Sequence, residues 1–215
     1  MAADRKKPWQ ISSLGRHDEG VRERRRVLIV CEDTKSSRLY FRAFNIDPER
    51  AEVLTVGTGI NTDSLVEEAT RRKARATAEH RPYNQVWCVL DRDDFPLTNY
   101  ERGFELARNA GIHMAWANEA FELWYLLHFN YHDTGISRND YKGKLKSFLP
   151  MPYDKADPGI YQKLLSHQPT AIRNARRLER RWIEMGERFP HRRNPSTRVH
   201  KLVEFLNELI ELGAA

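Results

Sequence analysis

The chain has 215 residues, of which 40% are hydrophobic and 31% charged, and its formal net charge is +6 at pH 7. This length fits one large domain or a domain with an appendage, and the hydrophobic content suffices for a core. The two cysteines, Cys31 and Cys88, are too few for a disulfide framework or a cysteine-built zinc site. No apolar stretch approaches the roughly 18 residues of a membrane span, and no apolar segment follows the basic N-terminus, so a cytoplasmic protein is expected.

Basic residues gather in three segments, at 1–26, 71–81 and 169–193. The last segment holds eight arginines and only three glutamates. An arginine guanidinium can donate two hydrogen bonds to one phosphate group. A solvated helix face explains any single cluster of this kind, whereas three clusters in one small chain favour a polyanionic partner.

The first predicted elements follow a basic arm at residues 1–25, which lacks hydrophobic periodicity and is expected to be flexible. The stretch RVLIVC (26–31) is short, apolar and β-branched, as is typical of a buried parallel strand. In KSSRLYFRAFN (35–45) the apolar residues recur at helical spacing, and Asp33 or Thr34 can cap this helix.

Strands and helices then alternate up to residue 130. The predicted strands are AEVLTV (51–56), QVWCVL (85–90) and IHMAWA (112–117), and the predicted helices are 63–79, 100–110 and 119–129. Ser64 with Glu67 and Thr98 with Glu101 have the spacing of a capping box. Gly111 stands where a helix C-terminus favours a left-handed residue.

Beyond residue 130 the sequence predicts only helices, at about 138–149, 158–167, 169–189 and 195–212. Asn194 can cap the last of them, with Pro195 at its first position. Strands that alternate with helices of this length indicate βαβ units. The expected fold is therefore α/β, with a mostly parallel four-stranded sheet flanked by helices in residues 26–130. A helical C-terminal extension, residues 131–215, is expected to pack on this core.

Two of the predicted strands end in acidic residues. Glu32 follows the first strand, and DRDD begins with Asp91 at the end of the third. Alternate residues of an extended chain face the same side, so Asp91 and Asp93 can project together while Asp94 points elsewhere. The carboxyl ends of parallel strands are where ligands bind, and an all-oxygen set of this kind suits Mg²⁺ or Mn²⁺. Acidic strand ends are also common without any ligand, and that alternative stays open.

Four stretches together resemble the RloB family, whose core is Toprim-like: LIVCEDTKSSRLYF, VWCVLDRDDFP, ANEAFELWYLLHF and NPSTRVHKLVEFL. They occur in order between about residues 26 and 212. The resemblance implies a metal-dependent nuclease, found with bacterial restriction and phage-defence genes, that acts on DNA or RNA with Mg²⁺ or Mn²⁺. An ATPase or another protein of the defence system is a further expected partner.

The family pattern places a glutamate after the first strand and a DxD after the third. The resemblance therefore implies that Glu32 transfers protons or binds metal, and that Asp91 and Asp93 bind Mg²⁺. It also implies a metal-binding or catalytic role for Glu122, in a second metal site. From the residues alone, Glu122 could instead be a helix cap or the partner of an arginine.

This chain departs from the family pattern at two positions. Asp33 stands where a glycine usually follows the strand-end glutamate. Glu119 stands where proline or a small residue is more usual. Neither departure removes a candidate ligand.

The candidate residues for nucleic-acid contact are Lys35, Arg92, Lys155, Arg173, Arg176 and Arg177. His128 and His132 have the spacing of a helical zinc pair, but no third ligand accompanies them and zinc is not expected. Tyr153 lies in the same loop as Lys155, and this loop could contact phosphate.

Three other functions fit part of the pattern. A phospho-receiver-like regulator also has an aspartate after its third strand, but no lysine after a fifth strand is found here. A phosphatase with a nucleophilic DxD normally carries that motif after the first strand. A basic nucleic-acid-binding adaptor with an inert acidic cluster is the third alternative.

Overall fold

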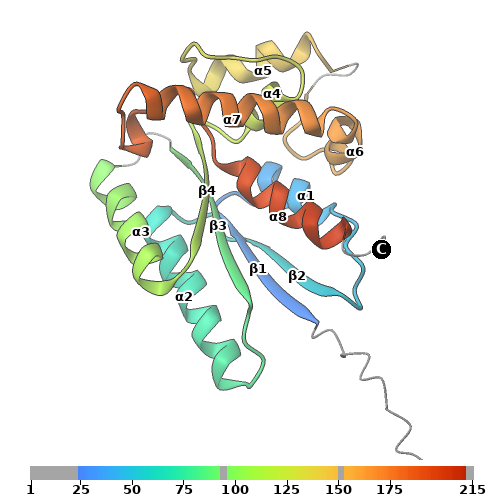
Figure 1. Ribbon diagram of the computed structural model, residues 1–215, viewed down its shortest axis with the longest axis vertical. Coiled ribbons are helices and arrows are strands. Elements are labelled where there is room, and N and C mark those ends of the chain that lie inside the picture. The colour runs from blue at the N-terminus through green and yellow to red at the C-terminus, as the bar shows by residue number, and fades with distance from the viewer. Residues whose placement is uncertain (1–23, 93–95, 150–152, 212–215) are drawn as a thin grey trace, which may run out of the picture.

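Four parallel strands form the centre of the computed structural model, which describes residues 24–92, 96–149 and 153–211. The strand order is β2-β1-β3-β4 (Figure 1). The strands are β1 (Arg25–Cys31), β2 (Ala51–Gly57), β3 (Gln85–Arg92) and β4 (His113–Asn118). The predicted four-stranded α/β fold is confirmed, and the arrangement is consistent with a Toprim-like core. The predicted basic arm lies outside the described residues up to residue 23, and Arg25 already belongs to β1.

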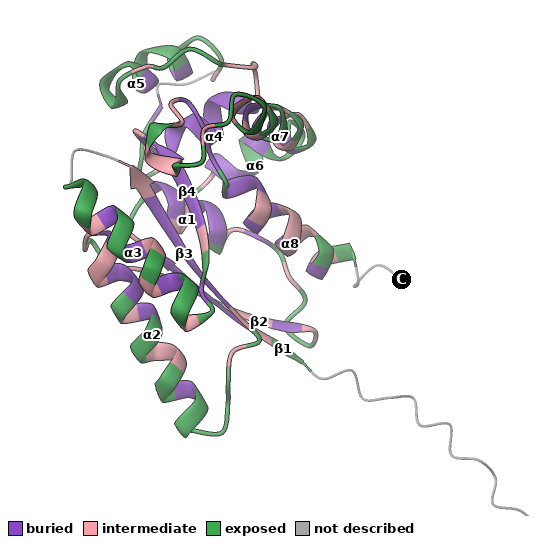
Figure 2. Ribbon diagram, turned by 60° about the vertical axis from the view of Figure 1, so that its left-hand side comes forward, coloured by how far each residue is buried: buried purple, intermediate pink, exposed green. Residues whose placement is uncertain are grey.

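The two faces of the sheet are buried by different helices. Along β1, Leu28 and Val30 pack into one hydrophobic cluster with residues of α2 (Thr62–Ala78) and α3 (Leu97–Ala110). The alternating residues Val27, Ile29 and Cys31 pack into the other cluster, with α1 (Ser36–Arg42) and α4 (Glu122–Leu127). Figure 2 shows the buried strands beside α2 and α3, whose outer surfaces are exposed, whereas α4 is buried along its whole length. Burial on both faces explains why the strands read as continuous apolar runs.

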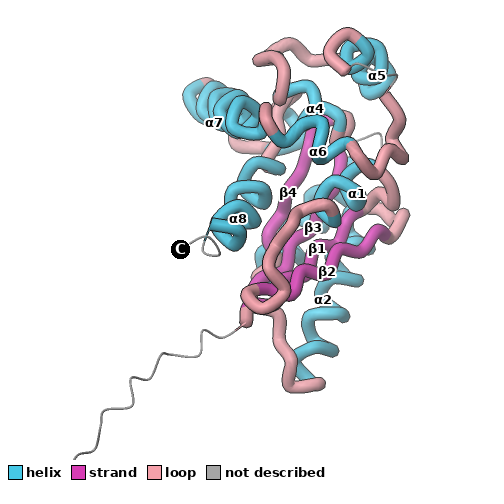
Figure 3. The backbone as a smooth tube through the Cα atoms, turned by 90° about the vertical axis from the view of Figure 1, so that its right-hand side faces the viewer, coloured by secondary structure: helices cyan, strands magenta, loops and turns pink. Residues whose placement is uncertain are grey.

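The C-terminal helices extend the second of these clusters. They are α5 (Arg138–Lys146), α6 (Ile160–Leu165), α7 (Gln168–Glu184), the short 3₁₀ helix η2 (Pro190–Arg192) and α8 (Val199–Glu211). Tyr141, Leu178 and Val203 belong to the same buried cluster as Ile29 of β1. Helix α8 lies alongside β4, and α7 packs against α4 (Figure 3). Among the described residues, no helix combines the length and the apolar character needed to cross a membrane.

The predicted start of the last helix is wrong. The helix begins at Val199, because the preceding segment runs beside the free edge of β4. Thr197 pairs in antiparallel fashion with Ala117, and the carbonyl of Ser196 accepts the N–H of Asn118 at 2.9 Å. Pro195 is therefore not the first helical residue and Asn194 is not the cap. The Thr197 hydroxyl instead accepts the N–H of Val199 at 3.1 Å.

Two further helix starts differ from the predictions. Helices α2 and α3 begin at Thr62 and Leu97, so Ser64 and Thr98 lie inside the first turn rather than at the caps. Gly111 has the predicted left-handed conformation, with φ 61° and ψ 45°.

The predicted helices at 119–129 and 169–189 are both shorter than expected. The first begins only at Glu122, because Glu119 has a φ of +67°, which a helix cannot contain. The second ends at Glu184, ahead of Gly186 with its φ of +74°.

Candidate active site

Glu32 joins the carboxyl ends of the two central strands. Its backbone N–H donates to the carbonyl of Val89 at 2.8 Å, which extends the pairing of β1 with β3. Its side-chain Oε2 accepts the backbone N–H of Asp91 at 3.0 Å. The two acidic residues predicted from separate strands are therefore neighbours in space, as parallel pairing requires.

Asp91 lies among other carboxylates at the end of β3. Burial raises the pKa of Asp91 well above its usual value, and the charges of Glu122, Glu32 and Asp33 raise it further. A hydrogen bond from the backbone N–H of Phe121 opposes this shift. The ionised form of Asp91 is thus disfavoured by its surroundings, and a bound cation would reverse that balance.

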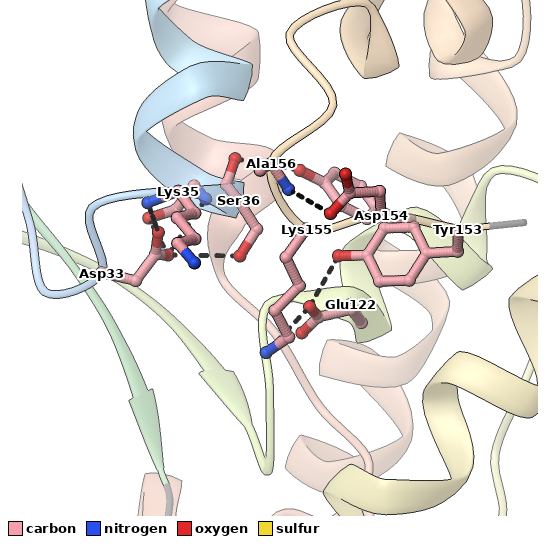
Figure 4. Close-up of polar contacts among 10 residues, drawn as sticks. Asp33, Lys35, Ser36, Glu122, Tyr153, Asp154, Lys155 and Ala156 are labelled. Carbon is pink, nitrogen blue, oxygen red and sulfur yellow. Dashed lines mark hydrogen bonds and ion pairs between the residues drawn. The ribbon is translucent and has the colours of Figure 1, made fainter.

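Glu122, the first residue of α4, is 2% exposed. Its Oε1 accepts a 2.6 Å hydrogen bond from the Tyr153 hydroxyl and lies 3.1 Å from Nζ of Lys155 (Figure 4). Burial and the Glu122 charge raise the pKa of Tyr153, which keeps its hydroxyl protonated as a donor. Among the described residues, Oε2 of Glu122 is buried without a hydrogen-bond partner. A buried carboxylate oxygen in that state favours a ligand, because leaving it unsatisfied is costly.

Asp33 has a structural role in capping α1. Its Oδ1 accepts the backbone N–H of Lys35 at 2.6 Å (Figure 4), and its Oδ2 accepts the backbone N–H of Ser37 at 3.0 Å. The Ser37 hydroxyl donates to Oδ2 as well, at 2.5 Å. The N-cap position itself is Lys35 rather than the predicted Asp33 or Thr34, but the Asp33 carboxylate still satisfies N–H groups at the helix start with both of its oxygens.

The described residues supply only part of the predicted metal-ligand set. Asp93 and Asp94 lie outside them, and within the described ranges no group of three or more His, Cys, Asp or Glu residues is placed to hold a metal ion. Glu32 and Glu122 nevertheless both lie close enough to Asp91 for their charges to raise its pKa. The raised pKa of Asp91 and the unpartnered oxygen of Glu122 both fit a divalent cation that prefers oxygen ligands.

Three of the predicted phosphate contacts lie near these acidic residues. Lys35 is exposed in the loop after β1, and Lys155 is the ion-pair partner of Glu122. Arg92 ends β3, and its guanidinium lies 5.7 Å from the centre of the Tyr100 ring.

The other three predicted contacts are exposed on α7 and have local partners. Arg176 forms an ion pair with Glu204 of α8, with Nε and Oε1 2.7 Å apart. Arg177 lies over the ring of Tyr131, 3.8 Å from its centre, and Arg173 donates to the hydroxyl of Thr170 at 2.8 Å. None of these contacts involves Glu32, Asp91 or Glu122.

A pocket of about 210 Å³ lies beside Glu122 and is not predicted by the sequence. It is lined by Glu122, Arg138, Tyr141, Lys142, Tyr153, Asp154 and Lys155. Arg138 and Lys142 are four residues apart on α5, and that spacing would have indicated a shared helix face. Their approach to Glu122 depends on tertiary packing and has no local signal.

His128 belongs to the core and has no zinc-ligand geometry. It is 1% exposed, its Nδ1 lies 2.9 Å from the carbonyl of Trp124, and burial lowers its pKa to about 4.

The family model described as RloB-like protein matches residues 27–206. Searches of curated proteins and of solved structures found no match. The matched range includes β1, β3 and α4, and therefore Glu32, Asp91 and Glu122. On this evidence the chain belongs to the family of RloB-like proteins.

Proposed function

We propose that the protein is a metal-dependent nuclease that hydrolyses phosphodiester bonds in DNA or RNA. The observation that carries this proposal is the environment of Asp91, whose backbone N–H donates to Glu32 and whose pKa is raised by burial and by the charges of Glu122 and Glu32. The carboxyl edge of a parallel sheet is the usual place for ligands. Carboxylates gathered there destabilise the fold unless positive charge joins them.

Asp91, Glu122 and Glu32 are the proposed ligands for Mg²⁺ or Mn²⁺, with Asp93 as a further ligand from outside the described residues. When bound, such a cation supplies positive charge against the phosphoryl oxygens and makes a water molecule more acidic. Glu32 also fixes the spacing of the two strand ends through its bond to the N–H of Asp91. The tyrosine and lysine on Oε1 of Glu122 orient that carboxylate.

The family resemblance supports a role in bacterial phage defence, in the cytoplasm, together with an ATPase or another protein of the same system. A nuclease that is toxic to its host requires control, and such a partner is a natural source of it. Cleavage by the isolated chain is then weaker than cleavage by the assembled system.

The direct test is cleavage of plasmid, single-stranded DNA and RNA, with Mg²⁺, with Mn²⁺ and with neither. Asp91→Asn and Glu32→Gln are expected to lower the rate at least about 100-fold. The matched control is Glu105→Gln, an exposed glutamate of α3, which should cleave like the wild type. Equal cleavage by both site variants and the wild type would refute the assigned site. Cleavage without any metal would refute the metal dependence.

A non-catalytic nucleic-acid-binding adaptor is the second candidate, supported by the exposed arginines of α7. It predicts salt-sensitive binding with no cleavage under any metal condition. A receiver-like regulator is disfavoured, because the described residues contain no fifth strand to carry the required lysine.

A further inference from the structure

The pocket beside Glu122 adjoins the proposed reaction centre. Glu122 belongs to both, because Oε1 meets Tyr153 and Lys155 in the pocket lining while its charge acts on Asp91. Figure 4 shows Tyr153 and Lys155 converging on this carboxylate. A group bound in the pocket therefore lies next to the acidic residues.

Positive charge exceeds negative charge in the pocket lining. Arg138 and Lys142 project from α5 and Lys155 from the following loop, against Glu122 and Asp154. Lys155 already balances Glu122 at 3.1 Å. Asp154 is partly engaged in its own turn, where Oδ1 accepts the N–H of Ala156 at 2.9 Å.

Tyr141 supplies a buried donor to the same pocket. The residue is 1% exposed, and its hydroxyl is buried with no hydrogen-bond partner in the described part of the chain. Burial and the nearby charges of Glu119, Asp91 and Glu122 raise its pKa, so the hydroxyl stays protonated. A buried hydroxyl without an acceptor is costly, and an oxyanion between this hydroxyl and the α5 cations would satisfy it.

The size of the pocket points to a single small group. Its volume of about 210 Å³ is below the roughly 300–1,000 Å³ of sites for whole small molecules. A phosphate group offers several acceptor oxygens to two cations and one hydroxyl at once.

We propose that this pocket is a phosphate subsite, in which Arg138, Lys142 and the Tyr141 hydroxyl hold a phosphate of the nucleic-acid chain beside the one that is cleaved. The identity of the substrate rests on the proposed nuclease function. Binding to the subsite requires no cleavage and can be measured separately from it.

The test is binding of a labelled single-stranded oligonucleotide in EDTA, followed by fluorescence anisotropy between 50 and 200 mM salt. The double variant Arg138→Ala/Lys142→Ala is expected to bind at least about tenfold more weakly, with the slope of log K against log salt reduced by about 1. The matched control Arg42→Ala/Arg108→Ala removes the same charge from exposed sites on α1 and α3, outside the three basic segments, and should bind within about twofold of the wild type. Equal weakening by both double variants would show general charge attraction and overturn the subsite.

Tyr141→Phe separates binding from folding. This variant is expected to bind about fivefold more weakly, because it loses one hydrogen bond to the phosphate. Its melting temperature should not fall, because the hydroxyl has no hydrogen-bond partner among the residues that the structure describes. Unchanged affinity, or a lower melting temperature, would overturn the role given to this hydroxyl.

Inorganic phosphate is the second probe. It should compete with the oligonucleotide on the wild type and not on Arg138→Ala/Lys142→Ala. If inorganic phosphate binds and the oligonucleotide does not, the pocket serves free phosphate and the substrate in the proposal is wrong. If the binding pattern holds while no preparation cleaves, the nuclease proposal fails and the subsite stands. If the wild type cleaves and the pocket variants bind as tightly as the wild type, the nuclease proposal stands and the subsite proposal fails.

Discussion

At the scale of single residues, the acidic side chains near the strand ends differ in their hydrogen-bond partners. Both carboxylate oxygens of Asp33 accept backbone hydrogen bonds at the start of α1. Glu32 holds a backbone N–H, whereas Glu122 keeps one buried oxygen without a partner among the described residues. Burial and the neighbouring charges disfavour the ionised form of Asp91. Carboxylates that destabilise the metal-free fold are better explained by a functional role than by a contribution to stability.

Asp91→Asn should make the metal-free protein more stable at pH 7. The pKa of Asp91 is raised in the folded state, so stability falls as the pH rises from about 3.8 through the folded value and the carboxyl ionises. Asparagine has nearly the same shape as aspartate but does not ionise. The substitution should therefore raise the free energy of unfolding by about 1 kcal/mol. Urea unfolding of the variant and the wild type in EDTA measures this difference in the free energy of unfolding.

Mg²⁺ should raise the melting temperature of the wild type and leave that of Asp91→Asn nearly unchanged, because only the carboxylate attracts the cation. Glu105→Gln serves as the control, since this exposed carboxylate lies on the outer side of α3. A variant that is less stable in EDTA, or that responds to Mg²⁺ like the wild type, contradicts the assignment.

At the scale of elements, the end of β2 supports the loop that carries the acidic residues. A Cβ atom added at Gly57 would lie 2.7 Å from the carbonyl oxygen of Asp33 and 2.8 Å from Cα of Thr34. Both are backbone atoms of the segment directly after Glu32, and they move only if that segment moves. Gly57 therefore allows β2 to approach the active-site loop closely.

Gly57→Ala is expected to lower the free energy of unfolding by about 1–3 kcal/mol through overpacking, and to lower cleavage with it. Gly143→Ala on α5 is the matched control. Beyond its own helix backbone and chain neighbours, no described atom lies within 4 Å of its added Cβ, and alanine in a helix gains about 0.5–1 kcal/mol. Urea unfolding should show that the free energy of unfolding falls in Gly57→Ala and rises in Gly143→Ala. A change of the same sign in both variants would contradict the close approach at Gly57.

Glu179 of α7 contacts the start of α8. Its Oε2 lies 3.3 Å from Nε2 of buried His200, and its Oε1 lies 3.2 Å from Nε of Arg198. The close approach of His200 is the main cause that lowers the pKa of Glu179 to about 2, and the charges of Arg198 and Lys201 add to it. The carboxylate therefore joins the two helices by charge.

A lowered carboxyl pKa contributes stability that is present above the usual value near 4.5 and is lost as the pH falls toward 2. Glu179→Gln should therefore cost about 1–3 kcal/mol at pH 7, and much less at pH 3. The measurement is urea unfolding at both pH values. Glu184→Gln, at an exposed position of the same helix, should show no such dependence. A cost for Glu179→Gln that does not change with pH would contradict the ion-pair origin.

At the scale of the whole molecule, the predicted core and the predicted extension share one hydrophobic cluster. Ile29 of β1, Trp124 of α4, Leu178 of α7 and Val203 of α8 all belong to it. The segment before α8 also bonds to the edge of β4. The C-terminal helices are therefore part of what buries one face of the sheet.

A chain cut after residue 130 should lose its cooperative unfolding transition, because this cut exposes the apolar face that α7 and α8 cover. Near-UV circular dichroism and binding of a hydrophobic dye compare the cut chain with the full one. Native near-UV signal with cooperative unfolding in the cut chain would show that residues 26–130 fold alone.

Local patterns in the sequence determined the elements and part of the site. Strand and helix periodicities predicted four strands alternating with helices, and parallel pairing placed Glu32 beside Asp91. These predictions succeed because side-chain spacing follows the geometry of a strand or helix, and because parallel strands end at one edge.

Only the tertiary structure decided the features that depend on distant segments. Tyr153 bonds to Glu122 across 31 residues of chain, and the Tyr141 hydroxyl lies near the acidic residues without a local signal. The start of α8 moved to Val199 because β4 offered a free edge to the backbone before it. Spacing along the chain determines which face of a helix or strand a side chain occupies. The packing of the elements against one another determines which distant residue that side chain contacts.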